Sequence, residues 1–170
     1  GLALEGLGRI DEALEAAGAA CENNPEDPNS LALHTRLELA RQGLHPLTKG
    51  ILKRRRDPVT VTASERQALK LAEERYTAGL RLPRRDKLWD VDRIRKDRGE
   101  VRLLLGQVSE ATEDARQAGA SGDKSLDLIL FTADAWLEMG TSAMMAAALP
   151  KASTAKPDQP AVALRRIQLM

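Results

Sequence analysis

The chain has 170 residues, of which 42% are hydrophobic and 2% aromatic, and its formal net charge at pH 7 is +1. A chain of this size can bury a core, which must here be built from small and aliphatic side chains, and its net charge selects no charged partner. Ala and Leu dominate, β-branched runs are scarce and no alternating strand pattern persists, so the sequence argues against a β-rich fold and predicts an all-α protein.

Cysteine usage and hydropathy set further bounds. Cys21 is the only cysteine, so neither an internal disulfide nor a cysteine-based metal site can form. No apolar run approaches the ~18 residues of a membrane-spanning helix, and no signal peptide is recognised. We therefore expect no membrane span, and the sequence leaves open whether the protein is cytoplasmic or periplasmic.

Helix-breaking and capping residues divide the start of the chain into short predicted helices. Residues 1–7 end one helix, which Gly8 closes, and residues 11–23 form the next, which stops because Pro25 lacks an amide hydrogen. Small residues recur at helical spacing in this second helix and predict a stripe that another helix can approach closely. The stripe comprises Ala13, Ala16, Ala17 and Ala20.

Two more helices are predicted before residue 60. Asn29 or Ser30 can cap a helix that runs to residue 42 and is closed by Gly43. Residues 46–56 form a fourth helix, which ends at Asp57 because proline disfavours helix in the residue before it.

The second half of the chain begins with a capping-box pattern, Thr62 followed three residues later by Glu65. It predicts a helix to about residue 78, with Gly79 just beyond the helix end. Residues 86–105 form either one long helix or two helices with a kink near Gly99, and Gly106 closes this segment. The remaining predicted helices cover residues 110–118, 126–139, 142–155 and the stretch from 161 onwards, with Gly140 at the end of the second.

The turn glycines define a period. Gly8 and Gly43 are 35 residues apart and Gly106 and Gly140 are 34 apart, whereas Gly43 and Gly106 are 63 apart, a little short of two units. A period of about 34 residues is the length of a helix–turn–helix repeat. The spacing therefore predicts a stacked array of such repeats with an irregular middle.

With this phase the chain resembles the tetratricopeptide repeat family, whose unit has Gly or Ala in the first helix, Gly at the turn, Ala twice in the second helix and a final Pro. The first unit places these on Gly1, Gly8, Ala13, Ala20 and Pro25. The fourth places the first four on Gly99, Gly106, Ala111 and Ala118, and the fifth uses Ala133, Gly140, Met145, Ala152 and Pro157. The unit around Gly43 has Thr48 and Arg55 in place of the alanines.

The resemblance implies a right-handed α-solenoid of antiparallel helix pairs, with about five repeats, the middle one irregular. The expected units cover residues 1–28, 29–60, 61–91, 92–125 and 126–159, and a further helix starts in 160–170. Because this phase places both chain ends within a helix, we expect a piece of a longer array whose uncapped ends can self-associate. An ordinary helical bundle with fortuitous glycine spacing is the alternative.

The sequence offers little catalytic chemistry. His34 and His45 have no acid or cysteine at metal-ligand spacing, and neither a nucleophile–base pair nor a phosphate-binding glycine loop is evident. Acids such as Glu110, Glu113 and Asp114 fall near a predicted helix start, where the helix dipole favours negative charge. We therefore expect a protein that is not an enzyme, with no cofactor and no metal.

The charge is unevenly distributed along the chain. Residues 1–30 sum to −6, residues 31–60 to +5 and residues 61–100 to +3. The middle of the chain carries a basic patch, formed by Lys53, Arg54, Arg55, Arg56, Arg84 and Arg85. Interspersed acids and few aromatic residues favour a solvated face, and an acidic polypeptide, an anionic polysaccharide or nucleic acid are the alternative partners of this patch.

We expect a non-catalytic scaffold that binds a partner polypeptide on its inner face, in a groove mixing apolar and basic side chains: Leu33, Leu37, Arg41, Arg93, Lys96 and Leu130. The Lys and Asn pattern with which some family members hold a terminal carboxylate is absent. High Ala, Leu and Arg usage suggests a bacterial protein, and analogy then points to an envelope or secretion assembly. The alternatives are a regulator or anionic-ligand module that uses the basic middle, and a helical accessory region of a larger enzyme.

Overall fold

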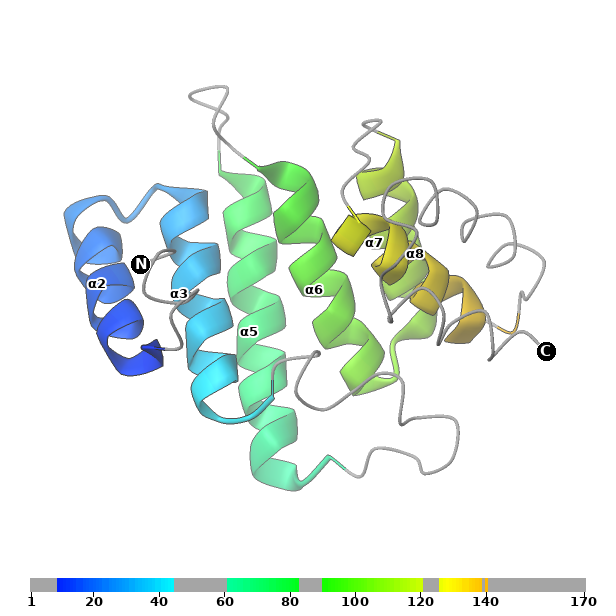
Figure 1. The fold of residues 1–170 in the computed structure, drawn as a ribbon, viewed down its shortest axis with the longest axis horizontal. Coiled ribbons are helices and arrows are strands. Elements are labelled where there is room, and N and C mark those ends of the chain that lie inside the picture. Colours follow the sequence, from blue (N-terminus) through cyan, green and yellow to red (C-terminus); the bar gives the residue numbers. More distant parts are fainter. Residues whose placement is uncertain (1–8, 45–60, 83–89, 121–125, 139, 141–170) are drawn as a thin grey trace.

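The computed structural model describes residues 9–44, 61–82, 90–120, 126–138 and 140, and all regular secondary structure in these ranges is helical. The helices are α2 (Ile10–Asn23), α3 (Pro28–Arg41), α5 (Ala63–Arg81), α6 (Val91–Leu105), α7 (Val108–Gly119) and α8 (Leu126–Glu138) (Figure 1). The all-α prediction is confirmed for these ranges. The helices predicted at 1–7, 46–56, 142–155 and after 161 lie outside the described residues.

Each described helix packs beside the next one along the chain. The side-chain contacts between neighbours show that they run antiparallel. Arg98 Nη1 donates to Thr77 Oγ1 at 3.2 Å and Arg102 Nε donates to Glu73 Oε1 at 2.9 Å, so residue numbers rise along α6 as they fall along α5. This is the packing of consecutive helix hairpins, in which each helix covers the apolar stripe of its neighbour.

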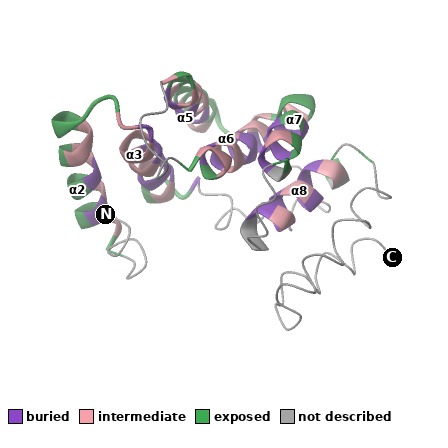
Figure 2. Cartoon of the chain, turned by 90° about the horizontal axis from the view of Figure 1, so that it is seen from above, coloured by how far each residue is buried: buried purple, intermediate pink, exposed green. Residues whose placement is uncertain are grey.

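Helices two places apart also touch, and these run parallel. Asp90 N donates to Asn29 Oδ1 and Arg36 Nη1 donates to Asp97 Oδ2, and both pairs span the same 61 residues, so α3 and α6 lie parallel and in register. α6 also touches α8. Seen from above in Figure 2, α3, α6 and α8 form one layer, and α5 and α7 form the other.

Glycines close three of the helical segments in a left-handed conformation. Within the described ranges, positive φ is confined to Gly43 (66°), Gly106 (81°) and Gly140 (73°). A side chain at these positions would be strained, and Gly106 lets the amides of residues 106 and 107 bond back to the last turn of α6. The sequence prediction that these glycines end helices is confirmed at each position.

The helix starts depend on local side-chain caps. The predicted capping box is confirmed: Glu65 N donates to Thr62 Oγ1 at 3.3 Å, and Thr62 N donates to Glu65 Oε2 at 2.8 Å. The predicted cap of α3 is wrong, because Asp27 takes this place. Its carboxylate accepts from the amides of Asn29 at 3.2 Å and Ser30 at 3.0 Å, and a proline occupies the first helical position, where its missing amide costs nothing.

Two interior glycines do not interrupt their helices. α5 continues past Gly79 to Arg81, so the predicted end near residue 78 is wrong; Gly79 is buried against Pro28 of α3, where a Cβ would lie in ordinary contact at 3.8 Å. Of the two alternatives for the next segment, α6 is one helix without a break at Gly99. It begins at Val91 because the Asp90 carboxylate caps it.

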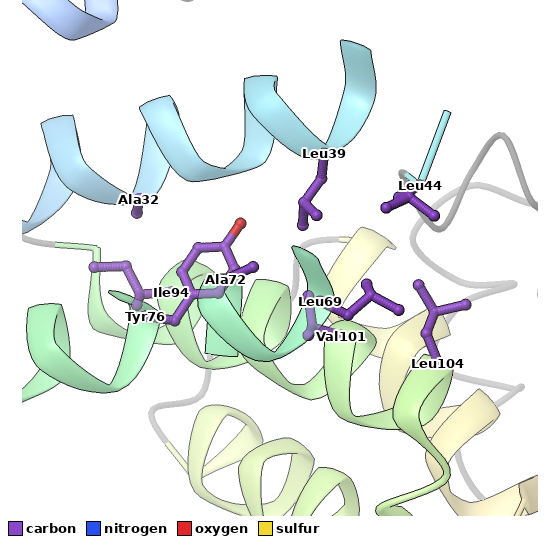
Figure 3. Close-up of a cluster of buried hydrophobic side chains, with 9 residues drawn as sticks. All are labelled: Ala32, Leu39, Leu44, Leu69, Ala72, Tyr76, Ile94, Val101 and Leu104. Atoms are coloured by element: carbon purple, nitrogen blue, oxygen red, sulfur yellow. The ribbon is translucent and has the colours of Figure 1, made fainter. Parts of the chain in front are cut away.

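Buried apolar side chains join the described helices in three clusters. The first links α3, α5 and α6 (Figure 3) and comprises Ala32, Leu39, Leu44, Leu69, Ala72, Tyr76, Ile94, Val101 and Leu104. The second lies between α6, α7 and α8, and the third joins Ala13 and Ala17 of α2 to Leu37 of α3. The predicted alanine stripe is narrower than expected, since Ala16 is exposed and Ala20 is only half-buried.

Candidate functional site

A groove of about 380 Å³ lies between the N-terminal halves of α3 and α6. Its apolar residues are Ala32, Leu33 and Ile94, and its polar and charged residues are Asn29, Ser30, Arg36, Asp90, Arg93 and Asp97. The groove exists because these two helices are parallel and in register, so that residues 61 positions apart face each other across it. It therefore belongs to the layer that α3, α6 and α8 form.

The groove end formed by the helix starts is held by backbone capping. Asp90 N donates to Asn29 Oδ1 at 3.3 Å, which ties the start of α6 to α3. One oxygen of the Asp90 carboxylate accepts from Arg93 N at 2.9 Å. The Arg93 side chain is exposed at the rim, and within the described part of the chain its guanidinium has no ion-pair partner.

The groove wall contains a buried ion pair. Arg36 and Asp97 are 7% and 4% exposed, and Arg36 Nη1 lies 3.5 Å from Asp97 Oδ2. Lys96 Nζ lies 3.4 Å from Asp97 Oδ1 and 3.2 Å from Glu100 Oε1. A buried charge that loses its partner is costly, so these contacts fix α3 against α6 in one register.

Glu100 extends this ionic group toward α8. Burial raises the pKa of Glu100 to about 7; Lys96 opposes this effect, and the carboxylates of Asp97 and Asp134 add to it. A carboxyl group with this pKa changes its charge around neutral pH. The charge beside the groove therefore depends on pH in the range where most binding experiments are made.

Replacing Glu100 with glutamine is expected to flatten the pH dependence of stability. Because the folded-state pKa lies above the unfolded value, the folded protein binds more protons than the unfolded chain between about pH 4.5 and 7, and stability falls as pH rises through this window. We expect the wild-type free energy of unfolding to drop by about 2 kcal/mol between pH 5 and pH 8 on account of Glu100. Urea unfolding at both pH values measures this, and an equal drop in Glu100→Gln would contradict it.

A second ionic group holds the opposite face of α6. Arg98 donates to both oxygens of Asp114, at 3.0 and 2.5 Å, and Arg102 Nη1 donates to the same carboxylate at 2.8 Å. Arg102 also donates to Glu73 of α5. Asp114 is 1% exposed in the middle of α7, so the prediction that it lies near the helix start, where the helix dipole favours its charge, is wrong. This group joins α5, α6 and α7 and is structural.

The structure brings together part of the predicted partner-binding set. Leu33 and Arg93 line the groove, and Lys96 lies one helical turn further along α6. Arg41 is exposed at the C-terminal end of α3. Leu37 is fully buried against α2 and Leu130 is 8% exposed, so both are core residues here. The basic patch of Lys53, Arg54, Arg55, Arg56, Arg84 and Arg85 lies outside the described residues.

Sequence reasoning missed Arg36, Asp97 and Glu100. The signal for Glu100 was present, because it follows Lys96 by four residues, which places this acid at ion-pairing distance on the same helix face. Alternating charge of this kind favours a solvated surface on sequence grounds. Nothing in the local sequence indicated that Arg36, 61 residues away, meets this face.

Among the described residues, the nucleophilic and metal-binding side chains form no recognisable catalytic group. Burial raises the pKa of the half-buried Cys21 thiol, and Asp27 adds to this effect, so the thiol stays protonated. His34 Nδ1 lies 4.0 Å from Glu38 Oε1. In the ranges that the structure covers, no cluster of three or more His, Cys, Asp or Glu side chains is arranged to hold a metal ion, and no helix has the length and apolarity to cross a membrane.

Comparison of the chain with protein-family models, with curated proteins and with solved structures found no match. The function is therefore inferred from the geometry of the chain itself.

Proposed function

We propose that this chain is a tetratricopeptide-like repeat array that acts as a non-catalytic scaffold and binds a polypeptide in the groove between α3 and α6. Two features support the repeat architecture. Helices α3, α6 and α8 alternate with α5 and α7 of a second layer, and Gly43, Gly106 and Gly140, three of the glycines that set the sequence period, have left-handed backbone. Repeat arrays use the extended surface of one helix layer for binding.

The helix contacts favour repeat boundaries that differ from those expected from the sequence. α6 and α8 meet at Gly99 and Phe131, close to one ordinary repeat of about 34 residues apart. α3 and α6 are offset by 61 residues, and α5 packs against both of them. We take α3 and α5 as the two helices of one unit that is about 27 residues longer than an ordinary repeat.

The groove carries the functional part of the proposal. The half-buried side chain of Leu33 offers apolar area, and Arg93 offers an exposed charge at the rim. A polypeptide segment suits such a mixture because its side chains can use the apolar floor and the charged rim together. Among the described residues that line the groove, the hydroxyl of Ser30 donates to the capping Asp27 carboxylate and not to a base in the groove, which favours binding over catalysis.

Charge reversal at Arg93 tests this function. Capped hexapeptides selected from a synthetic library on the immobilised protein serve as the probe, and isothermal titration calorimetry measures their affinity. We expect Arg93→Glu to weaken binding about tenfold, because a rim charge of the wrong sign repels a segment that the wild-type side chain attracts.

Arg66→Glu is the matched control, since Arg66 is exposed on α5 in the other layer and makes no contact with the groove. It should leave the affinity within a factor of two. Equal affinities for wild type and Arg93→Glu, or a library that yields no binding peptide, would refute binding in this groove.

A further inference from the structure

Three buried carboxylates gather where α6 meets α8. Asp97 and Glu100 of α6 are 4% and 7% exposed, and Asp134 of α8 is 3% exposed. The backbone of α6 at Gly99 lies against the Phe131 ring of α8. Glu100 directly follows this glycine and Asp134 lies one helical turn beyond the ring, so these two acids flank the contact between the helices.

The two acids of α6 differ in the positive charge beside them. Asp97 lies near two cations, Arg36 at 3.5 Å and Lys96 at 3.4 Å. Among the described residues, Glu100 forms its ion pair with Lys96, at 3.2 Å, so one ammonium group serves two buried carboxylates. A buried acid is costly to ionise unless opposite charge compensates it, and of these two acids Glu100 has less compensation. The raised pKa of its carboxyl group, about 7, agrees with this arrangement.

The faces of α6 differ in the sign of the charges that meet them. On the α3 side, Arg36 pairs with Asp97. On the side of α5 and α7, the ion pairs are made by Arg98, Arg102, Glu73 and Asp114. On the α8 side, an ionised Glu100 instead meets the negative charge of Asp134, which raises the pKa of Glu100. Like charges repel more strongly in a buried contact than in water, so ionisation of Glu100 weakens the contact between α6 and α8.

We propose that α8 is a pH-responsive segment, which stays docked on α6 while Glu100 is protonated and separates from α6 more readily once Glu100 is ionised. Separation lets water reach the Glu100 carboxylate and moves it away from Asp134. The pKa of Glu100 is about 7 in the docked state and 4.5 when the group is solvated, so a rise in pH through this window favours separation. This behaviour is independent of peptide binding in the groove.

Amide hydrogen exchange of the full chain, followed by NMR at pH 6 and pH 8, tests this proposal. Protection factors, which correct for the intrinsic exchange rate at each pH, report how often each helix opens. We expect α8 to be less protected than α5, because separation of α8 leaves the rest of the fold in place. Its protection should fall about tenfold from pH 6 to pH 8, since opening releases Glu100 from its raised pKa. In Glu100→Gln the protection of α8 should change by less than a factor of two.

Two controls make the result specific. Helix α2 packs on α3, and its opening leaves Glu100 buried, so the protection of α2 should not change with pH. Glu113→Gln removes an exposed acid of α7 and should keep the wild-type response of α8.

Three results would overturn the proposal. Equal protection of α8 and α5 at both pH values would mean that α8 does not separate on its own. Lower protection of α8 that is independent of pH would mean that its opening leaves Glu100 buried. A tenfold fall that persists in Glu100→Gln would assign the response to another group.

Discussion

Replacing Asp114 with alanine is expected to lower the free energy of unfolding by about 3–5 kcal/mol, because it leaves two partly buried arginine side chains without their shared buried acid. Arg98 and Arg102 both donate to this carboxylate, which is 1% exposed. The side chain is small, so little of the loss comes from removed apolar area. Urea unfolding followed by far-UV circular dichroism gives the free energy directly.

Glu113 supplies the matched control on the same helix. Its carboxylate pairs with Arg116 in solvent, with both side chains about half exposed or more, and such exposed pairs contribute little to stability. Glu113→Ala should therefore cost less than a quarter of what Asp114→Ala costs. A loss below about 1 kcal/mol for Asp114→Ala would mean that apolar contacts alone hold α5, α6 and α7 together.

Local features of the fold were predictable because their causes lie within a few residues. The capping box needs only Thr62 and Glu65, and the left-handed ends need only a glycine such as Gly43 or Gly106 after an apolar-periodic segment. The error at Gly79 shows the limit of this reasoning. A glycine near a helix end is read as a stop, whereas here α5 continues through Gly79, which is buried against Pro28 and Leu31 of α3.

The surroundings of α6 could not be predicted in this way. Charged residues cover two opposite sides of this helix, with Arg93, Lys96, Asp97 and Glu100 on one side and Arg98 and Arg102 on the other. Such a pattern is typical of a solvated helix. In the structure α6 instead touches α3, α5, α7 and α8, and several of its charges are neutralised by residues between 12 and 61 positions away. Only the tertiary fold brings these partners together.

The candidate site was partly predictable from repeat phase. The repeat phase assigns one face of the first helix in each repeat to the binding surface. Leu33 and Arg93, which it places on that face, do line the groove. Leu37 lies one turn beyond Leu33, but α2 packs on that turn and covers it with Ala13 and Ala17. Repeat phase therefore gives the helix face, whereas the neighbouring helix decides how much of that face remains accessible.

Replacing Gly99 with leucine is expected to lower the free energy of unfolding by about 3 kcal/mol, at the upper end of the range for an overfilled core. Gly99 lies inside α6, where the Phe131 ring of α8 packs directly on its backbone. A Cβ at this position would overlap the ring edge and lie only 3.0 Å from Cε2 and 3.1 Å from Cε1. The second buried cluster, to which Phe131 belongs, leaves the ring little room to move. Urea unfolding of the purified variant measures the loss.

A double-mutant cycle shows whether the ring is the cause. Gly99→Ala alone should destabilise, although alanine gains about 1 kcal/mol of helix propensity over glycine, because the overlap outweighs this gain. In a Phe131→Ala background the overlap is gone, so adding Gly99→Ala should become neutral or stabilising. Gly18→Ala is the control, because Gly18 lies inside α2 and an added Cβ would be an ordinary 3.6 Å from its nearest neighbour, His34. This substitution should stabilise the protein by up to about 1 kcal/mol. Equal effects of Gly99→Ala with and without Phe131 would mean that the two helices are not held at this close approach.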